Sequence, residues 1–208
     1  MAEGLFITFE GTDGSGKTTQ IELLARYLKE KGYRVVTTIE PGGTGLGKKI
    51  RKILLGRENA GMSARAETLL FQASRAELVS RVIGPALDSG SIVICDRFFD
   101  STIVYQGIAR GLGADDILDM SLWATAGLVP DITFLLTLDE GSCSRRLSGT
   151  FRDRIEMEAE SFQRRICQGY RELAERFSDR IVDIDAGLTI KEISAIIREK
   201  VDRELKRI

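Results

Sequence analysis

The sequence contains no histidine, and of its 208 residues only three are proline and three are cysteine. The absence of histidine removes the commonest general base and excludes the Ser–His and Cys–His pairs of nucleophilic catalysis. The cysteines are odd in number, widely spaced and without a C-x-x-C pair, which argues against a disulfide framework or a zinc site. They are Cys95, Cys143 and Cys167. We therefore expect a cytoplasmic protein, kept in a reducing environment, whose chemistry does without histidine.

The chain also lacks an excess of charge and a long hydrophobic run. Lys and Arg number 30 against 31 Asp and Glu, so no overall positive field would hold a nucleic acid or an anionic membrane. No apolar stretch approaches the roughly 18 residues of a membrane span, and the apolar run at the N-terminus is too short for a signal peptide. We expect a small-molecule partner, with no nucleic acid and no membrane.

What the sequence does contain is a regular alternation of short apolar segments with helical patterns. The apolar segments are β-branched and nearly continuous in hydrophobicity, which is typical of buried parallel strands. Such an alternation predicts right-handed βαβ units and an open α/β sheet. No repeat or linker interrupts it, so we expect one domain over residues 1–208. The expected strands are 5–10, 33–39, 91–96, 131–138 and 180–185.

Helical patterns lie between these segments. An amphipathic helix is expected after the first strand, where apolar residues recur at helical spacing and Gly32 follows the last of them. A second is expected over residues 63–81. A third begins with Thr189 and Glu192, which have the spacing of a capping box.

The stretch GTDGSGKTT, residues 11–19, fits the phosphate-binding pattern G-x-x-x-x-G-K-[ST] and stands between a strand and a helix, as that pattern requires. Backbone N–H groups of residues 14–18 would surround a phosphate, Lys17 would bridge β- and γ-phosphate oxygens, and the Thr18 hydroxyl would ligate Mg²⁺. The expected ATP-binding residues are Gly11, Thr12, Asp13, Gly14, Ser15, Gly16, Lys17, Thr18 and Thr19. A second glycine cluster, GGTGLGK at 42–48, lacks the right spacing and is interpreted as a loop.

The third expected strand ends in Asp96, and Arg97 follows directly. An acid at this place commonly holds Mg²⁺ in phosphate-loop proteins, and the arginine can neutralise a phosphate. The alternative is a helix-capping aspartate beside a solvated arginine. The absence of histidine favours an acceptor that is already an anionic phosphate, because phosphoryl transfer to it needs no proton removed.

Several separated motifs together resemble the thymidylate kinase family, of the bacterial type, over essentially the whole chain. They are FEGTDGSGKTTQ at 9–20, EPGGT at 40–44, LLFQASRAE at 69–77, DRFFDSTIVYQG at 96–107 and DRIE at 153–156. The resemblance implies a P-loop NTPase fold with five parallel strands in the order 2-3-1-4-5 and a mobile lid at about 142–156. It also implies a homodimer that phosphorylates dTMP to dTDP with ATP and Mg²⁺, in dTTP biosynthesis.

The same resemblance assigns roles to individual residues. Asp13 would bind the sugar 3'-hydroxyl, and Arg97 and Arg51 the acceptor phosphate. Phe71 would stack on thymine while Arg75 and Thr102 address its polar edge, and Tyr105 would exclude a 2'-hydroxyl. Residue types alone leave Phe71 open as a core residue and Arg51 as part of a solvated basic face. The substrate-binding set is Asp13, Arg51, Phe71, Arg75, Arg97, Ser101, Thr102 and Tyr105, with Thr18 and Asp96 at the metal and Lys17, Asp96, Arg97 and Arg152 catalytic.

The lid and two departures from the family pattern complete the prediction. The family supplies a charge-neutralising arginine from the phosphate loop or from the lid; because position 14 is glycine, we expect it from the lid, with Arg152 favoured and Arg146 or Arg154 as alternates. Ile39 stands where the family usually has arginine, and Phe98 where it has tyrosine. Two other functions remain: a kinase for another small nucleotide such as dUMP, and a P-loop ATPase or GTPase switch, against which the missing N-K-x-D motif argues.

Overall fold

The fold is built on one parallel sheet of five strands. In this computed structural model the described residues are 4–138, 154–155 and 157–206. The sheet order is β2-β3-β1-β4-β5, and every neighbouring pair is parallel, which confirms the order that the family resemblance implies. The strands are β1 (Leu5–Glu10), β2 (Val35–Ile39), β3 (Ile92–Asp96), β4 (Ile132–Thr137) and β5 (Ile181–Asp185).

The central strands are buried on both faces, as their continuous hydrophobicity predicts. All six residues of β1 are buried, and β3 is buried except at its last residue, Asp96. Buried threonine side chains in this region are paired: the hydroxyls of Thr8 and Thr133 lie 2.8 Å apart, and Thr133 also accepts from Arg180 at 3.0 Å. Four of the five expected strands begin one or two residues early, since positions such as Tyr33 are exposed and precede the ladder.

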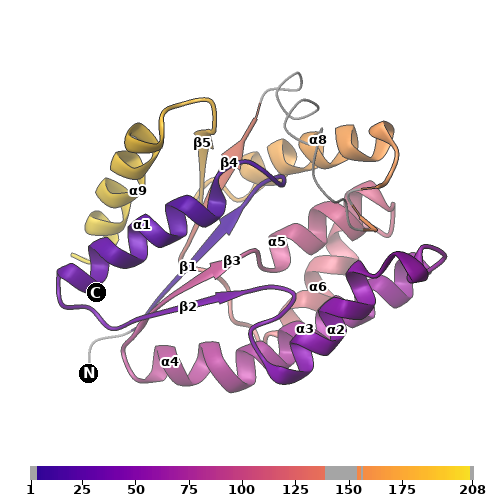
Figure 1. Cartoon of the computed structure of the whole chain (residues 1–208), viewed down its shortest axis with the longest axis horizontal. Coiled ribbons are helices and arrows are strands. Elements are labelled where there is room, and N and C mark those ends of the chain that lie inside the picture. The colour runs from indigo at the N-terminus through magenta and orange to yellow at the C-terminus, as the bar shows by residue number, and fades with distance from the viewer. Residues whose placement is uncertain (1–3, 139–153, 156, 207–208) are drawn as a thin grey trace.

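Helices cover both faces of the sheet (Figure 1). On one face, α1 and α9 pack with β1, β3 and β4 around a core that includes Phe9, Leu24 and Ile197. On the other face, a second core gathers around Phe6, Phe98 and Ile166. The helices are α1 (Lys17–Glu30), α2 (Gly45–Leu55), η1 (Arg57–Asn59), α3 (Ala64–Leu78), η2 (Val79–Ile83), α4 (Gly84–Asp88), α5 (Phe99–Thr102), η3 (Ile103–Ala109), α6 (Ala114–Ala124), α8 (Glu160–Arg176) and α9 (Ile190–Glu204).

The helix expected over 63–81 is longer and less regular than predicted. It begins as α3, capped by the Ser63 hydroxyl, which accepts a hydrogen bond from the Ala66 N–H at 3.3 Å. It then continues through the π-helical turn η2 into α4. Pro85 lies in the first turn of α4 and has no N–H to donate, so the hydrogen-bonding register changes around it.

The capping box at the start of α9 is confirmed. The Thr189 hydroxyl accepts from the Glu192 N–H at 3.3 Å, and the Thr189 N–H donates to the Glu192 carboxylate at 2.8 Å. Among the helices in the described ranges, none has the length and hydropathy that crossing a membrane requires. The glycine cluster at 42–48 is a loop only as far as Thr44, which caps α2 by accepting from the Gly47 N–H.

Candidate active site

The phosphate loop connects β1 to α1 at the carboxyl edge of the sheet. Its shape requires glycine at two positions. Gly11 has φ 127°, and a Cβ there would come within 2.3 Å of the Leu136 carbonyl oxygen. Gly16 has φ 97° at the start of α1 and opens onto free space, so its backbone can approach a ligand. The loop therefore presents the N-terminus of α1 to an anion.

Lys17 lies under this loop rather than in solvent. Its ammonium group donates to the carbonyl oxygens of Gly11, at 3.0 Å, and Thr12, at 2.9 Å. Burial, reinforced by the nearby Arg97 charge, lowers the pKa of Lys17 to about 8, while the carboxylates of Asp13 and Asp96 oppose the shift. Keeping the Lys17 ammonium group charged in this buried position therefore costs free energy, and the negative charge of a bound polyphosphate would stabilise the charged form.

A magnesium ion fits beside this loop. Thr18 and Asp96 line the same pocket, and one carboxylate oxygen of Asp96, Oδ1, is buried without a hydrogen-bond partner in the described part of the chain. Within that part no three Asp, Glu, His or Cys side chains gather as a metal site. An ion here would depend on phosphate and water oxygens for the rest of its shell, as Mg²⁺ commonly does.

Arg97 follows β3 in a left-handed backbone conformation, with φ 67°. Such a conformation is strained for a residue with a side chain, and it is typical of functional sites. It directs the guanidinium toward the phosphate loop, where Arg97 donates to Asp13 Oδ1 at 2.9 Å. Arg97 also donates to the hydroxyls of Ser101 and Tyr170, each at 3.1 Å. The Arg97 charge is the main reason why the pKa of Asp13 is lowered.

Glu10, which the sequence interpretation missed, fixes the side chains of Ser101 and Tyr170 that contact Arg97. Its carboxylate accepts from the Phe98 N–H at 2.7 Å, from the Ser101 hydroxyl at 2.5 Å and from the Tyr170 hydroxyl at 3.1 Å. Burial raises the pKa of Glu10, and the nearby Asp100 carboxylate adds to the rise. Glu10 thus orients both hydroxyls that accept from Arg97. The signal in the sequence was a single glutamate closing an otherwise apolar strand, LFITFE.

A second pocket lies next to the phosphate loop and gathers the expected acceptor residues. Phe71, Arg75, Ser101, Thr102 and Tyr105 all line it. The residues shared by this pocket and the phosphate-loop pocket are Asp13, Glu40, Arg51 and Arg97. Two ligands bound in the two pockets would therefore meet at these four side chains.

Arg75 is fully buried at the base of the second pocket. It forms an ion pair with Glu40, at 2.7 Å from Nη2 to Oε2, and donates from Nη1 to Gln72 Oε1 at 2.8 Å. It also donates from Nη2 to the Thr102 hydroxyl at 2.9 Å. Neither Glu40 nor Gln72 was among the predicted site residues. Each is recognised as part of the site only through its contact with Arg75, which lies 35 residues from Glu40 and three residues from Gln72.

The aromatic residues of the pocket combine packing and lining. Phe71 packs partly against the second core and also lines the pocket. It can therefore be both a core residue and a residue that contacts a ligand. Tyr105 lies edge-on to Phe162 and Tyr170, with ring centroids 6.4 and 6.3 Å apart. Burial raises the pKa of the Tyr105 hydroxyl, and the Arg97 guanidinium lies 5.6 Å from its ring.

The two departures from the family pattern have clear positions. Ile39 is exposed and lines the phosphate-loop pocket, where an arginine would otherwise add charge. Arg51 lines both pockets and is tied to the Pro41 carbonyl at 2.9 Å, so a cation stands close by. Phe98 is buried edge-on to Phe6, and its ring lies 5.4 Å from the Arg75 guanidinium.

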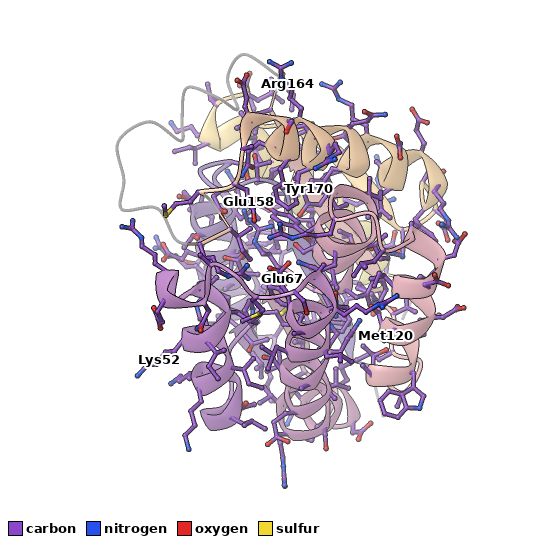
Figure 2. The ribbon with its side chains drawn as sticks, turned by 90° about the vertical axis from the view of Figure 1, so that its right-hand side faces the viewer. Lys52, Glu67, Met120, Glu158, Arg164 and Tyr170 are labelled. Atoms are coloured by element: carbon purple, nitrogen blue, oxygen red, sulfur yellow. The ribbon has the colours of Figure 1, made fainter. Side chains whose placement is uncertain are left out.

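Of the three lid arginines proposed as candidates, Arg146 and Arg152 lie outside the described residues. Arg154 is buried and pairs with Glu67, while its Nε donates to the Leu54 carbonyl at 2.8 Å. Glu67 also pairs with Arg110, and it lies at the centre of the face shown in Figure 2, with Glu158 and Tyr170 above it. This ion pair argues against Arg154 as the arginine that closes over a nucleotide.

The chain is similar to known proteins over nearly its whole length. A family model described as thymidylate kinase matches residues 9–197. A thymidylate kinase from an Exiguobacterium species is 45% identical, over 99% of this chain and 96% of its own, and one from Gloeobacter violaceus is 47% identical, over 95% and 94%. The crystal structure of thymidylate kinase from Ehrlichia chaffeensis superposes with a TM-score of 0.79 at 35% identity, covering 96% of this chain and 99% of that one. The chain therefore belongs to the thymidylate kinase family.

Proposed function

We propose that this protein transfers the γ-phosphoryl group of ATP to dTMP, yielding dTDP and ADP, as a step of dTTP biosynthesis. The observation that carries the proposal is the pair of adjoining pockets, which share Asp13, Glu40, Arg51 and Arg97. One pocket has a phosphate loop and the other an aromatic wall with a buried arginine. Family membership supplies the identity of the two substrates.

On the donor side, the loop N–H groups and the positive end of α1 hold the triphosphate. Lys17 exchanges its two carbonyl partners for phosphate oxygens, which keeps its charge paired. Thr18 and Asp96 would hold Mg²⁺, which would supply charge neutralisation on the transferred group. This chain needs no general base, because the attacking oxygen belongs to a phosphate that is already ionised.

On the acceptor side, Arg97 and Arg51 bind the dTMP phosphate where the two pockets meet. Asp13 accepts a hydrogen bond from the sugar 3'-hydroxyl, and Tyr105 occupies the space that a 2'-hydroxyl would need. Phe71 stacks on the base, and Arg75 with Thr102 addresses its polar edge. An oxygen of the dTMP phosphate then forms a bond to the γ-phosphorus while the bond from that phosphorus to the β-phosphate oxygen breaks, and ADP leaves.

The lid, at about 142–156, supplies the remaining positive charge in this proposal. Gly14 offers no side chain at the loop position that carries an arginine in some family members. Arg154 is engaged with Glu67, which leaves Arg152 as the favoured arginine. Closure of a lid over the two nucleotides would also exclude water as a competing acceptor.

We also propose that the protein is a cytoplasmic homodimer. The cytoplasm is where ATP, the phosphoryl donor, is concentrated. Helices α2, α3 and α6 lie side by side in Figures 1 and 2, and each carries an exposed large apolar side chain. These are Ile53, Leu69 and Trp123. Contact between such side chains would bury apolar surface. Light scattering measures the mass, and a monomer at all concentrations would contradict the dimer.

One experiment tests the reaction itself. The protein is incubated with ATP, Mg²⁺ and each nucleoside monophosphate in turn, and ADP formation is followed. We expect dTMP to raise ATP turnover most. If dTMP is no better than CMP or AMP, the substrate assignment is wrong. If no acceptor raises turnover, the protein is not a nucleotide kinase.

A further inference from the structure

Glu40 lies between the two pockets, directly after β2, and belongs to neither the phosphate loop nor the acceptor helix α3. Its side chain is 3% exposed. A single carboxylate oxygen, Oε2, accepts from Arg75 Nε at 2.8 Å and contacts Arg75 Nη2 at 2.7 Å. This side-on contact fixes the plane of the guanidinium as well as its position.

Two further contacts limit the Arg75 side chain. Nη1 donates to Gln72 Oε1 at 2.8 Å, and Gln72 is itself tied to Ser121 on α6, at 2.8 Å between Nε2 and Oγ. Nη2 donates to the Thr102 hydroxyl at 2.9 Å. An arginine has five N–H groups. Three of them donate in these hydrogen bonds, one from each nitrogen, and Nη2 also lies at ion-pair distance from Glu40. The guanidinium of this pocket-lining residue is therefore held through all three of its nitrogens.

A guanidinium held in this way is a donor that cannot turn away and has no acceptor atom. It can satisfy a base whose exocyclic group is a carbonyl oxygen, as in thymine and uracil. It cannot satisfy cytosine, whose amino group at the same position is also a donor, so that two donors would face each other in a buried site. Leaving buried polar groups unpaired is the strongest means by which a pocket rejects a close analogue.

We propose that Glu40 sets the selectivity of the acceptor pocket for 4-oxo over 4-amino pyrimidines, by fixing the direction in which Arg75 donates. Glu40 is a positioning residue here, because it acts through Arg75 and does not itself read the base. The inference rests on the proposed function, since it assumes that the acceptor is a pyrimidine nucleotide read by Arg75.

The surroundings of Glu40 support this role. Its second oxygen, Oε1, is buried and has no hydrogen-bond partner among the described residues. Burial raises the pKa of Glu40 to about 7, against the opposing effect of Arg75. A buried carboxylate with an unpaired oxygen costs stability, and such groups concentrate at functional sites. An arrangement selected for stability alone would satisfy both oxygens.

The test compares three acceptors in the wild type and in Glu40→Gln. Values of kcat/KM are measured for dTMP, dUMP and dCMP at saturating ATP. We expect the ratio of dTMP to dCMP to fall about tenfold or more in the variant, because Arg75 becomes free to turn away from an amino group. The ratio of dTMP to dUMP should stay the same, because these two share the 4-oxo group and differ only in a methyl group.

Two further variants keep this test sharp. Glu40→Asp retains the negative charge, so Arg75 is not left buried without a partner. Its shorter side chain should loosen the contact with Arg75. The ratio of kcat/KM for dTMP to that for dCMP should therefore fall, but by less than in Glu40→Gln. Glu67→Gln is the matched control, since Glu67 is an equally buried carboxylate that pairs with Arg110 and Arg154. It should lower the melting temperature without changing either ratio.

The outcomes separate the inference from the proposed function. A folded Glu40→Gln or Glu40→Asp enzyme that retains the wild-type preference for dTMP over dCMP overturns the inference alone. Equal falls in both ratios also overturn it, because they would indicate a general distortion of the pocket. A wild-type enzyme that phosphorylates dCMP as well as dTMP overturns the proposed function, and this inference with it.

Discussion

The two adjoining pockets are built from different parts of the polypeptide. The phosphate-loop pocket draws Asp13, Gly14, Gly16, Lys17, Thr18 and Thr19 from one consecutive segment, in which Gly14 and Gly16 have positive φ. The acceptor pocket consists of side chains from α2, α3, α5 and η3, joined by buried hydrogen bonds. In the first pocket the side chain of Lys17 therefore acts within a segment whose shape is set locally, whereas the second pocket depends on a network of distant residues. Substitutions should reveal this difference.

The largest effect is expected from Lys17→Met. Turnover should fall by about three orders of magnitude or more, because a cation on the transferred phosphate is lost. The fold should stay intact, since methionine removes the cost of burying a charge at this position. Stopped-time assays and thermal denaturation measure the two effects. Lys29→Met, on the exposed side of the same helix, is the control, and a near-normal kcat in Lys17→Met would contradict the loop assignment.

Arg75→Ala should act on one substrate only. We expect kcat/KM for dTMP to fall about a hundredfold while KM for ATP changes little, because the base loses a buried charged partner. Steady-state kinetics with each substrate varied in turn measure this. Arg65→Ala, at an exposed position on the same helix, should leave both values unchanged. Equal weakening of dTMP and ATP would place Arg75 outside the acceptor site.

Arg152→Ala tests the contribution of the lid to the contrast between the pockets. We expect kcat to fall about tenfold to a hundredfold with small changes in both KM values, because the charge would act mainly on the transferred group. Arg164→Ala, on the exposed side of α8, serves as the control for the removal of an arginine charge. An unchanged kcat would exclude Arg152 from this role.

The smallest expected effect is a pH dependence of ATP binding. Lys17 has a pKa of about 8 in this structure, and bound phosphates would raise it. Above pH 8, ATP binding must therefore be accompanied by proton uptake, and Kd for ATP should rise up to about tenfold per pH unit. Calorimetry in buffers of different ionisation enthalpy measures the proton. Lys17→Arg, charged throughout this range, should bind ATP with little pH dependence, and a flat wild-type profile would contradict the lowered pKa.

The same lowered pKa has a defined effect on stability. Between pH 8 and the ordinary lysine pKa, the unfolded chain binds more protons at Lys17 than the folded chain does. The free energy of unfolding should therefore rise with pH across this window as far as Lys17 is concerned. Binding of ATP should weaken in the same window.

The sequence predicted the strands and the phosphate loop because both are local patterns. The continuous apolar runs at 5–10 and 91–96 predict buried strands, and GTDGSGKTT predicts a loop of known geometry. The acceptor residues came from resemblance to the family and not from local physics. Phe71, for example, has the sequence pattern of a core residue. Only the assembled pocket shows that it packs against the core and also lines the acceptor pocket.

The residues that were missed act through contacts between distant parts of the chain. Glu10 and Tyr170 are 160 positions apart, and Glu40 and Arg75 are 35 apart. A single carboxylate at the end of a strand does not indicate its partners until the topology brings them together. The π-helical turn at Val79–Ile83 was missed for a similar reason, because a periodic pattern does not show where a helix changes its hydrogen-bonding register.

Helix α3 has a consequence for exchanging parts between related enzymes. Glu67, Phe71 and Arg75 follow one another at intervals of four residues along it. The first holds Arg154, and the other two line the acceptor pocket. A chimaera that takes α3 from one relative and the segment around Arg154 from another would separate a buried carboxylate from its guanidinium. The two segments should therefore be transferred as a unit, although about 80 residues of sequence separate them.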